Sequence, residues 1–324
     1  MKRFKSFLAE QMEDFIEYRL QLGYSDRMLI YSLKILDQYV RKKDAGWASF
    51  DPLFFIRFRA SLDHESRSIN MVFRMLKMFF NFLVRRDHVQ GNPLGEIAEL
   101  KENQTIPFIF SPEETDLLLK ALIKMIRTTG AYYLNDFSVY IAFLLMARCG
   151  LRVSETINLQ KVNYRSEEKT IYIEKTKFKK DRLIPIPKDV CCEINNLINV
   201  RRVLIEKDNN PLLLVRRDKT GFSWIALHRR FKKALNHIHF NESRKVIGST
   251  NFCGPTHHSL RHSFAVNTLK RIKQQGKFPQ NALPVLAVYM GHSEYKYTTK
   301  YLRVLDAEHR RQIFDFSMLR SEDV

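Results

Sequence analysis

Four separated clusters of the sequence contain residue types that could carry out chemistry. They are Gly150-Leu151-Arg152-Val153-Ser154-Glu155, a run with lysines at 175, 177, 179 and 180, then His258-Ser259-Leu260-Arg261-His262, and last Gly291-His292 with Tyr301 nine positions after the histidine. Each cluster taken alone fits an ordinary structural role, such as a surface arginine, a solvated turn or a half-buried tyrosine. Their combination is more informative.

Together the clusters contain what a metal-free cleavage of a phosphodiester requires. Arg152 and Arg261 offer planar guanidinium groups, each able to donate two hydrogen bonds to one phosphate. Lysine and histidine can move a proton. A tyrosine hydroxyl can attack phosphorus and keep the bond energy in an aryl phosphate, from which the strand can be resealed. We therefore interpret Tyr301 as a nucleophile and the arginines as groups that neutralise the phosphate.

The histidines of the third cluster also allow a different interpretation. His258 and His262 are four residues apart, and on a helix this spacing places both on one face, as in some zinc sites. However, the glutamate of a metalloprotease motif does not follow, and the nearby Cys253 is solitary. We expect neither a metal ion nor a cofactor, and we leave His262 as a structural or DNA-contacting residue.

The composition favours a polyanionic partner. The 324 residues include 54 Lys and Arg against 35 Asp and Glu, a formal net charge of +19. Most of this surplus lies after residue 100, where the sequence contains 38 basic and 22 acidic residues. Such a charge favours nucleic acid and makes binding salt-dependent through counterion release.

The cysteines and the apolar segments indicate in which cellular compartment the protein is expected. Four cysteines occur without a CxxC pair, as expected for a reducing compartment. Acidic residues soon interrupt the apolar pattern at the amino terminus, so no signal peptide is expected. No stretch reaches the roughly 18 apolar residues of a membrane span. We expect a cytoplasmic protein with no membrane partner, associated with the nucleoid when it binds DNA.

Periodic apolar positions predict the elements that must hold the clusters. Residues 1–98 are expected to form four amphipathic helices, the fourth with Arg74, Lys77, Arg85 and Arg86 on its outer face. A polar connection over 99–110 precedes a capping box at residues 111–114, which starts a new helix. We expect a long apolar helix from Asp136 to Cys149 and a β-hairpin over 170–187 with the lysines at its tip. Further helices follow, so the chain is predicted to be mainly α with one small sheet.

The order and spacing of the clusters resemble the motifs of the tyrosine recombinase, or phage integrase, family. That family reads approximately G-L-R-x-S-E, a Lys on a β-hairpin, H-x-L-R-H, and G-H with Y nine residues after that His. The match extends over nearly the whole chain, which is similar to simple two-domain Xer-like or mobile-element integrases. The resemblance implies a SAM-like four-helix core-binding domain at 1–98, a linker at 99–110, and an α+β catalytic domain with a carboxy-terminal tail at 111–324. Together the two domains would form a C-shaped clamp on DNA.

The resemblance also implies a role for each matched residue. Arg152 and Arg261 would clamp the scissile phosphate and neutralise its charge. His258 would act as acid and base near the nucleophile, and His292 would hydrogen-bond the phosphate. Glu155 would orient Arg152 or a neighbouring histidine.

By the same resemblance, Tyr301 would attack to form a 3′-phosphotyrosyl link and a free 5′-hydroxyl. Attack by the hydroxyl of another duplex would then complete strand exchange without ATP or metal. Tyr295 and Tyr297 are rivals by proximity, but their spacing from His292 is wrong for the nucleophile.

The general acid is the position at which the chain departs from the family pattern. Many relatives read G-K-G-x-K-x-R, whereas residues 176–182 here are TKFKKDR. Aligning Arg182 and the Leu-Ile-Pro-Ile after it puts Lys177 in the position that would protonate the departing 5′ oxygen. Lys175 and Lys179 are the alternatives.

The resemblance thus implies a site-specific DNA recombinase, for integration, excision, transposition or dimer resolution. Its partners would be double-stranded DNA recombination sites and three further copies of the chain, in a homotetramer joined by exchange of the C-terminal tail. We expect no arm-binding domain before the helices, and therefore a simple integrase rather than a two-site phage enzyme. Two alternatives are a type IB topoisomerase-like enzyme that works as a monomer and a catalytically silent DNA-binding relative.

Overall fold

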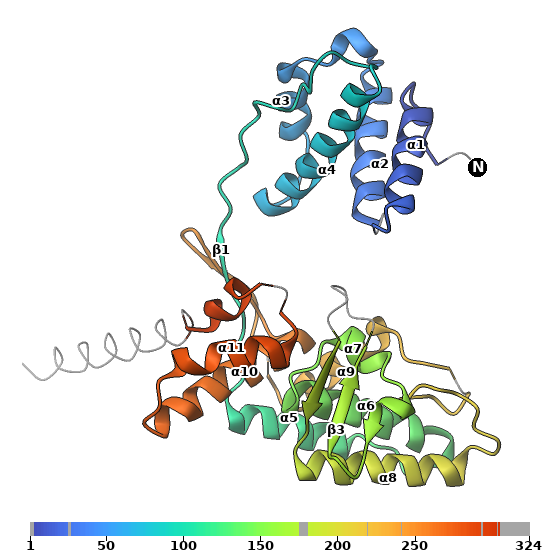
Figure 1. The fold of residues 1–324 in the computed structure, drawn as a ribbon, viewed down its shortest axis with the longest axis vertical. Coiled ribbons are helices and arrows are strands. Elements are labelled where there is room, and N and C mark those ends of the chain that lie inside the picture. The colour runs from blue at the N-terminus through green and yellow to red at the C-terminus, as the bar shows by residue number, and fades with distance from the viewer. Residues whose placement is uncertain are drawn as a thin grey trace, which may run out of the picture. The chain divides into compact units, whose positions relative to one another are not determined.

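The chain folds into two compact units, Met1–Gln104 and Thr105–Val324. The protein is described from a computed structural model that covers residues 3–24, 27–174, 181–218, 220–240, 242–292, 294–302 and 304. Figure 1 shows the helices and strands of each unit. The predicted domain limits, with a linker at 99–110, stay a prediction.

The first unit is built from four helices, as predicted. They are α1 (Ala9–Gln21), α2 (Arg27–Lys42), α3 (Pro52–Ala60) and α4 (Ser66–Arg85), with a 3₁₀ turn at Trp47–Ser49 (Figure 1). Asp51 caps α3 by accepting a hydrogen bond from the Phe54 backbone N–H at 2.6 Å. Phe79 and Phe80 of α4 are fully buried in the hydrophobic core that the helices share. Burial of these large side chains makes α4 a central element of the unit.

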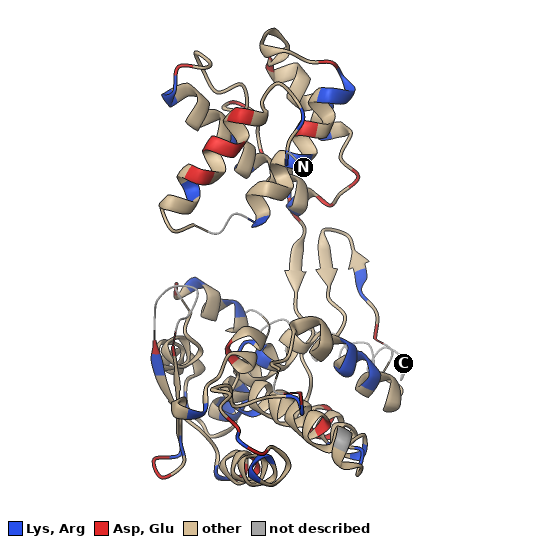
Figure 2. Ribbon diagram, turned by 90° about the vertical axis from the view of Figure 1, so that its right-hand side faces the viewer, with Lys and Arg blue, Asp and Glu red and all other residues tan. Residues whose placement is uncertain are grey.

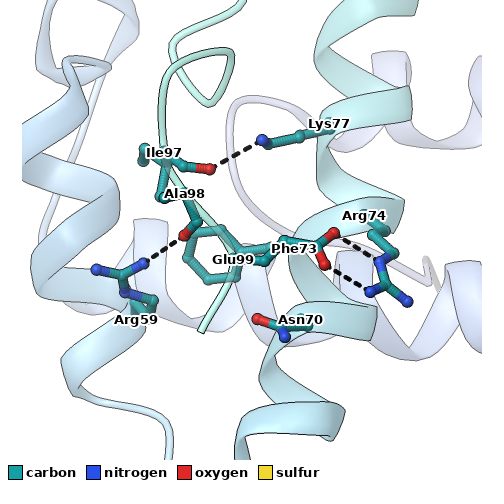
Figure 3. A pocket seen from close by; sticks show the side chains of 8 residues that line it. All are labelled: Arg59, Asn70, Phe73, Arg74, Lys77, Ile97, Ala98 and Glu99. Carbon is teal, nitrogen blue, oxygen red and sulfur yellow. Dashed lines mark hydrogen bonds and ion pairs between the residues drawn. The ribbon is translucent and has the colours of Figure 1, made fainter. Parts of the chain in front are cut away.

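The segment that follows α4 is tied back to the unit by side-chain hydrogen bonds (Figure 3). Asn70, which is 2% exposed, donates to the Leu100 carbonyl at 2.8 Å and accepts from the Leu100 N–H at 2.9 Å. Basic side chains bind the residues just before it: Arg59 the Ala98 carbonyl, Lys77 the Ile97 carbonyl, and Arg74 the Glu99 carboxylate. Two of the four basic residues predicted on the outer face of α4, Arg74 and Lys77, therefore bind the connecting segment.

The second unit is arranged around α6 (Gly130–Arg148), which is buried along most of its length. It contacts α5 (Pro112–Lys124), α8 (Lys188–Leu204) and α10 (His257–Gln274). The capping box predicted at Ser111 is present and starts α5. The predicted start of α6 at Asp136 is wrong, because the helix already begins at Gly130. The Asp136 carboxylate is buried and binds Arg127 and Arg230 instead.

Further helices complete the second unit. They are α7 (Val153–Ile157), a 3₁₀ turn at Lys161–Asn163, α9 (Trp224–His237), α11 (Pro279–Met290), and helical residues 296–302, which carry Tyr301. The sequence did not predict α8, because its Asp, Asn and Cys residues are weak helix formers. Val190, Ile194 and Leu197 nevertheless recur at helical spacing and are fully buried, so packing stabilises this helix.

The described part of the chain contains two three-stranded sheets, where the sequence predicted one. The predicted hairpin is present in the sheet of β2 (Tyr164–Arg165), β3 (Thr170–Ile173) and β4 (Arg182–Pro185), with Ile171 opposite Ile184. The second sheet has the order β1 (Gln104–Ile106), β6 (Thr250–Phe252) and β5 (Lys245–Ile247). Its strands have three residues each and are mostly exposed, so they lack the apolar alternation that would predict them.

Helices dominate both units, which confirms the predicted mainly α fold with little sheet. Among the residues that the structure describes, no helix is long and apolar enough to cross a bilayer. The hairpin tip at 175–180, with Lys177 and its alternatives Lys175 and Lys179, lies outside the described residues, as does the tail from 305.

Replacement of Asn70 by Ala should loosen the connecting segment. The substitution leaves both polar backbone groups of Leu100 without their side-chain partner, at a cost of about 1–3 kcal/mol. We expect the Leu100 amide to exchange with solvent faster in hydrogen-exchange measurements. Ser68→Ala, at an exposed position of the same helix, is the control and should leave that amide unchanged. Equal exchange in Asn70→Ala and the wild type would contradict the assignment.

Candidate active site

A buried carboxylate, that of Glu155, binds three arginines. Glu155 is in the first turn of α7, and its side chain is 6% exposed. Its oxygens accept hydrogen bonds from both terminal nitrogens of Arg182, at 3.1 and 2.9 Å, and from Nη1 of Arg152 at 2.6 Å. Nη1 of Arg261 lies 3.8 Å from the carboxylate. One negative charge thus holds guanidinium groups that come from α10, from β4 and from the residue before α7.

The carboxyl end of α11 binds the same three arginines. Arg182 donates through Nε to the Tyr289 carbonyl at 2.7 Å, Arg261 through Nη2 to the Met290 carbonyl, and Arg152 through Nη2 to the Gly291 carbonyl at 2.9 Å. Carbonyls at the end of a helix have no intrahelical partner and lie at the negative end of its dipole, so they favour cationic donors. The end of α11 therefore fixes the orientation of all three guanidinium groups.

Two glycines allow the backbone to come this close. Gly150 and Gly291 both have φ +62°, in the left-handed region that glycine adopts without strain. Arg261 donates through Nη1 to the Gly150 carbonyl at 2.6 Å. A Cβ atom on Gly291 would lie 2.7 Å from Nη1 of Arg182, and one on Gly150 would lie 2.5 Å from the ring of Phe264. Both motif glycines are thus required by backbone conformation and by packing.

The cluster carries more positive than negative charge. Three guanidinium groups are balanced by one carboxylate among the described residues that compose it. Burial alone would raise the pKa of Glu155, but the hydrogen bonds and charge of Arg182, with Arg152 and Arg261, lower it to about 2. Burial and the charge of Arg152 in turn lower the pKa of Arg261. An anion such as a phosphodiester would relieve this surplus.

The Tyr301 hydroxyl lies beside the cluster in a small hydrophobic core. Tyr301 is 4% exposed and packs with buried residues of α10 and α11. Its hydroxyl is 3.0 Å from Nδ1 of His262, and its ring stacks against that of His292 with 6.1 Å between centroids. Burial raises the pKa of Tyr301, while the charges of Arg261 and Arg152 partly oppose this effect. The phenol is therefore protonated at neutral pH, and it would need a base to act as a nucleophile.

The histidines of the site are neutral at neutral pH. Burial and the charge of Arg261 lower the pKa of His258 to about 4 and that of His292 to about 3. Burial and the proximity of His258 lower the pKa of His262 to about 3. His292 is fixed by Thr298, whose hydroxyl is 2.7 Å from its Nδ1. Neutral imidazoles can each accept or donate a hydrogen bond through either ring nitrogen, depending on the tautomer.

Most of the sequence-predicted residues come together here. Arg152, Arg261 and Glu155 form the charged cluster, and His292 lies after the helix end that binds them. His258 is in the first turn of α10. The positive charges of Arg152 and Arg261 act on the Tyr301 hydroxyl and favour its ionised form. The roles assigned to these residues stay predictions. Among the described residues, no group of three potential ligands could hold a metal ion.

Sequence reasoning missed the parts played by Arg182, His262 and Thr298. In the sequence Arg182 served only to match the hairpin to the family pattern. In the structure it is 8% exposed and makes a bidentate ion pair with Glu155. Residues alternate between the two faces of a strand, so Arg182 shares a face with Ile184 and Ile186. This pattern could have indicated that the arginine is buried. The contacts of His262 and Thr298 join segments far apart in the sequence, and no local pattern predicts them. The rival Tyr295 and Tyr297 are 49% and 38% exposed, unlike Tyr301.

Two helices of the second unit supply a basic surface. Together α9 and α10 contain seven Lys and Arg besides the buried Arg261 and no Asp or Glu, whereas α1 of the first unit contains four acidic residues and one basic residue. Figure 2 shows the positions of the charged residues along the ribbon. Helices so strongly charged favour a polyanion such as the DNA backbone.

Comparisons with known proteins give matches over most of the chain. The profile of the phage integrase family matches residues 112–308. The putative integrase/recombinase y4rB of Sinorhizobium fredii is 24% identical over 92% of this chain and 93% of its own length. The tyrosine recombinase XerA of Pyrococcus furiosus is 27% identical over 96% of this chain and 94% of its own.

A solved structure is similar in fold. The recombinase XerH, bound to a palindromic difH substrate after cleavage, superposes with a TM-score of 0.68 at 14% identity. The similarity covers 94% of this chain and 84% of the XerH chain.

Gly291→Ala should damage the arginine cluster as well as the backbone. The new Cβ would lie 2.7 Å from Nη1 of Arg182, which three hydrogen bonds hold in place. Gly276→Ala is a matched control, because Gly276 also follows a helix with positive φ but has open space around it. Both variants should lose about 1–2 kcal/mol of stability from the left-handed backbone, measured by urea unfolding. Gly291→Ala alone should also lose at least about tenfold in DNA cleavage; equal activities would contradict the account.

Glu155→Gln should destabilise the protein in a pH-dependent manner. A pKa lowered from 4.5 to about 2 corresponds to roughly 3 kcal/mol of stability at pH 7. Because the folded pKa is below the unfolded one, this contribution is complete above about pH 5 and is lost as the pH falls toward 2. Urea unfolding should therefore show a gap between wild type and variant that shrinks to about half by pH 3. Glu167→Gln, on an exposed turn, is the control, and a gap independent of pH would contradict the prediction.

Proposed function

Given that this chain belongs to the phage integrase family, we propose that it is a site-specific DNA recombinase that cuts and rejoins DNA through a 3′-phosphotyrosyl link at Tyr301. The observation that carries the proposal is the Tyr301 hydroxyl, buried beside an arginine cluster that has positive charge to spare. This proximity supports the proposal, because a nucleophile and the groups that bind the phosphate must lie close together.

Arg152 and Arg261 would bind the non-bridging oxygens of the scissile phosphate. Arg152 uses Nη1 for Glu155 and Nη2 for Gly291, and its side chain is still 27% exposed. A guanidinium has five N–H groups, so donors remain for a phosphate. Negative charge grows on these oxygens in the transition state, and fixed guanidinium groups stabilise it without reorganisation.

The proposed cleavage step balances as follows. The bond from phosphorus to the 5′ oxygen breaks, the bond from phosphorus to the Tyr301 oxygen forms, and the 5′ oxygen takes a proton from Lys177. The phenolic proton of Tyr301 leaves to a base beside it, a transfer in which His258 would take part, and His292 would hydrogen-bond the phosphate. Rejoining is the reverse reaction with the 5′-hydroxyl of another strand, so the step needs no external energy.

DNA recombination sites would be the substrate, and a homotetramer the working assembly. The similarity to XerH, solved with its palindromic difH substrate, supports the first part. The basic helices α9 and α10 support it independently. We assign the joining of subunits to the tail from residue 305, which would dock on a neighbouring copy. Residues 1–98 would form the core-binding domain and 111–324 the catalytic domain of a clamp around DNA.

A nicked suicide substrate tests the proposed chemistry. The wild type should form a protein–DNA adduct that resists denaturation, because the nick lets the 5′ fragment diffuse away before it can be rejoined. Tyr301→Phe should form none, since it lacks the attacking oxygen. Tyr297→Phe, one helical turn earlier, is the control and should retain the adduct.

The other outcomes identify the alternatives. An adduct that survives Tyr301→Phe would move the nucleophile elsewhere. No adduct with the authentic site would favour a DNA-binding relative without catalysis. Relaxation of any supercoiled plasmid by monomers would favour a topoisomerase-like enzyme over a recombinase.

A further inference from the structure

His262 is the hydrogen-bond partner that the structure gives to the Tyr301 hydroxyl. It follows Arg261 on α10, and its Nδ1 lies 3.0 Å from that oxygen, with 5.7 Å between the two rings. Tyr301 is in turn held by the hydrophobic core of α10 and α11. Among the hydrogen bonds of the described residues, none joins His258 to Tyr301. The residue in place to receive the phenolic proton is therefore the second histidine of the cluster.

The surroundings of His262 keep its ring neutral. The groups that face it are His258 one turn earlier on α10, with 4.6 Å between ring centroids, and Tyr301; the charges of Arg261, His292 and Lys300 also act on it. Burial comes first and these groups second in lowering the pKa of His262 to about 3. In the tautomer protonated at Nε2, Nδ1 carries a lone pair and accepts the phenolic O–H.

We propose that His262 is a catalytic residue, the general base that accepts the proton of Tyr301 during attack on the phosphate. As the oxygen of Tyr301 bonds to phosphorus, its proton moves to Nδ1 of His262, and the departing 5′ oxygen takes a different proton, from the acid assigned to Lys177. In rejoining, His262 returns the proton to the tyrosine. This inference rests on the proposed function and names the acceptor of the proton.

The arriving phosphate makes this transfer feasible. Protonated His262 would be unfavourable beside Arg261 and His258 in the free protein, which keeps the base in its active, neutral form. A phosphodiester adds negative charge at the cluster and so stabilises the imidazolium as it forms. The rings of His258 and His262 are in T-shaped contact. His258 would then bind the phosphate or pass on the proton.

Two substitutions separate the hydrogen bond from the proton transfer. His262→Asn keeps an oxygen near the position of Nδ1 that can accept from Tyr301 but cannot take its proton. His262→Phe keeps the ring shape and removes both functions. His237→Asn, at the exposed last residue of α9, is the control. The full-length variants are compared in single-turnover cleavage of the suicide substrate, with DNA binding and thermal unfolding as checks on folding.

The pH profile distinguishes a base from a structural residue. With a neutral base present, the wild-type rate should be flat between about pH 6 and 8. Without it, attack depends on the fraction of phenolate, so the rate of His262→Phe should fall about 100-fold or more at pH 7 and rise about tenfold per pH unit. His262→Asn should show the same slope with a smaller loss. Replacing Tyr301 by 3-fluorotyrosine, a more acidic phenol, should raise the rate of both variants but not that of the wild type.

Two results would overturn the inference while leaving the proposed function intact. One is Tyr301-dependent cleavage by both His262 variants within about threefold of the wild-type rate. The other is a reduced rate with a flat pH profile and no gain from 3-fluorotyrosine, which would make His262 structural. Failure of the wild type to form an adduct at all would instead overturn the proposed function.

Discussion

A carboxylate buried among guanidinium groups is stable only while each partner stays in place, because loss of one leaves a charge without compensation. In this protein that constraint falls on Glu155, which pairs with Arg182 and Arg152 and lies 3.8 Å from Arg261. The same arginines bind three successive carbonyls at the end of α11. Glu155 and α11 therefore fix the arginines from two sets of contacts, and the left-handed Gly291 makes the second set possible.

The charge that Glu155 leaves uncompensated governs the rest of the site. It favours an anionic ligand, and together with burial it keeps His258, His262 and His292 neutral until such a ligand arrives. Tyr301 is held protonated by burial in the small core between α10 and α11. In the free protein the Tyr301 phenol and the three histidines are therefore uncharged beside a cluster with surplus positive charge.

The sequence predicted those parts of the site that local patterns encode. The spacing of Arg152, Arg261, His292 and Tyr301 predicts that they belong to one site. Apolar periodicity predicts the four amino-terminal helices. Arg182 and His262 were missed as functional residues because their partners lie on other elements, 27 and 39 residues away in the chain. The second sheet was missed because its strands are short and exposed, and α8 because tertiary packing overrides its weak propensity.

The central claim is that a buried tyrosine beside the arginine cluster carries the covalent link to DNA. Mass spectrometry of the trapped adduct, digested with nuclease and then trypsin, tests it most directly, because lysines and arginines separate the neighbouring tyrosines into different peptides. We expect a nucleotide remnant on the peptide Tyr301-Leu302-Arg303. A remnant on the peptide of Tyr295 or on that of Tyr297 would contradict it.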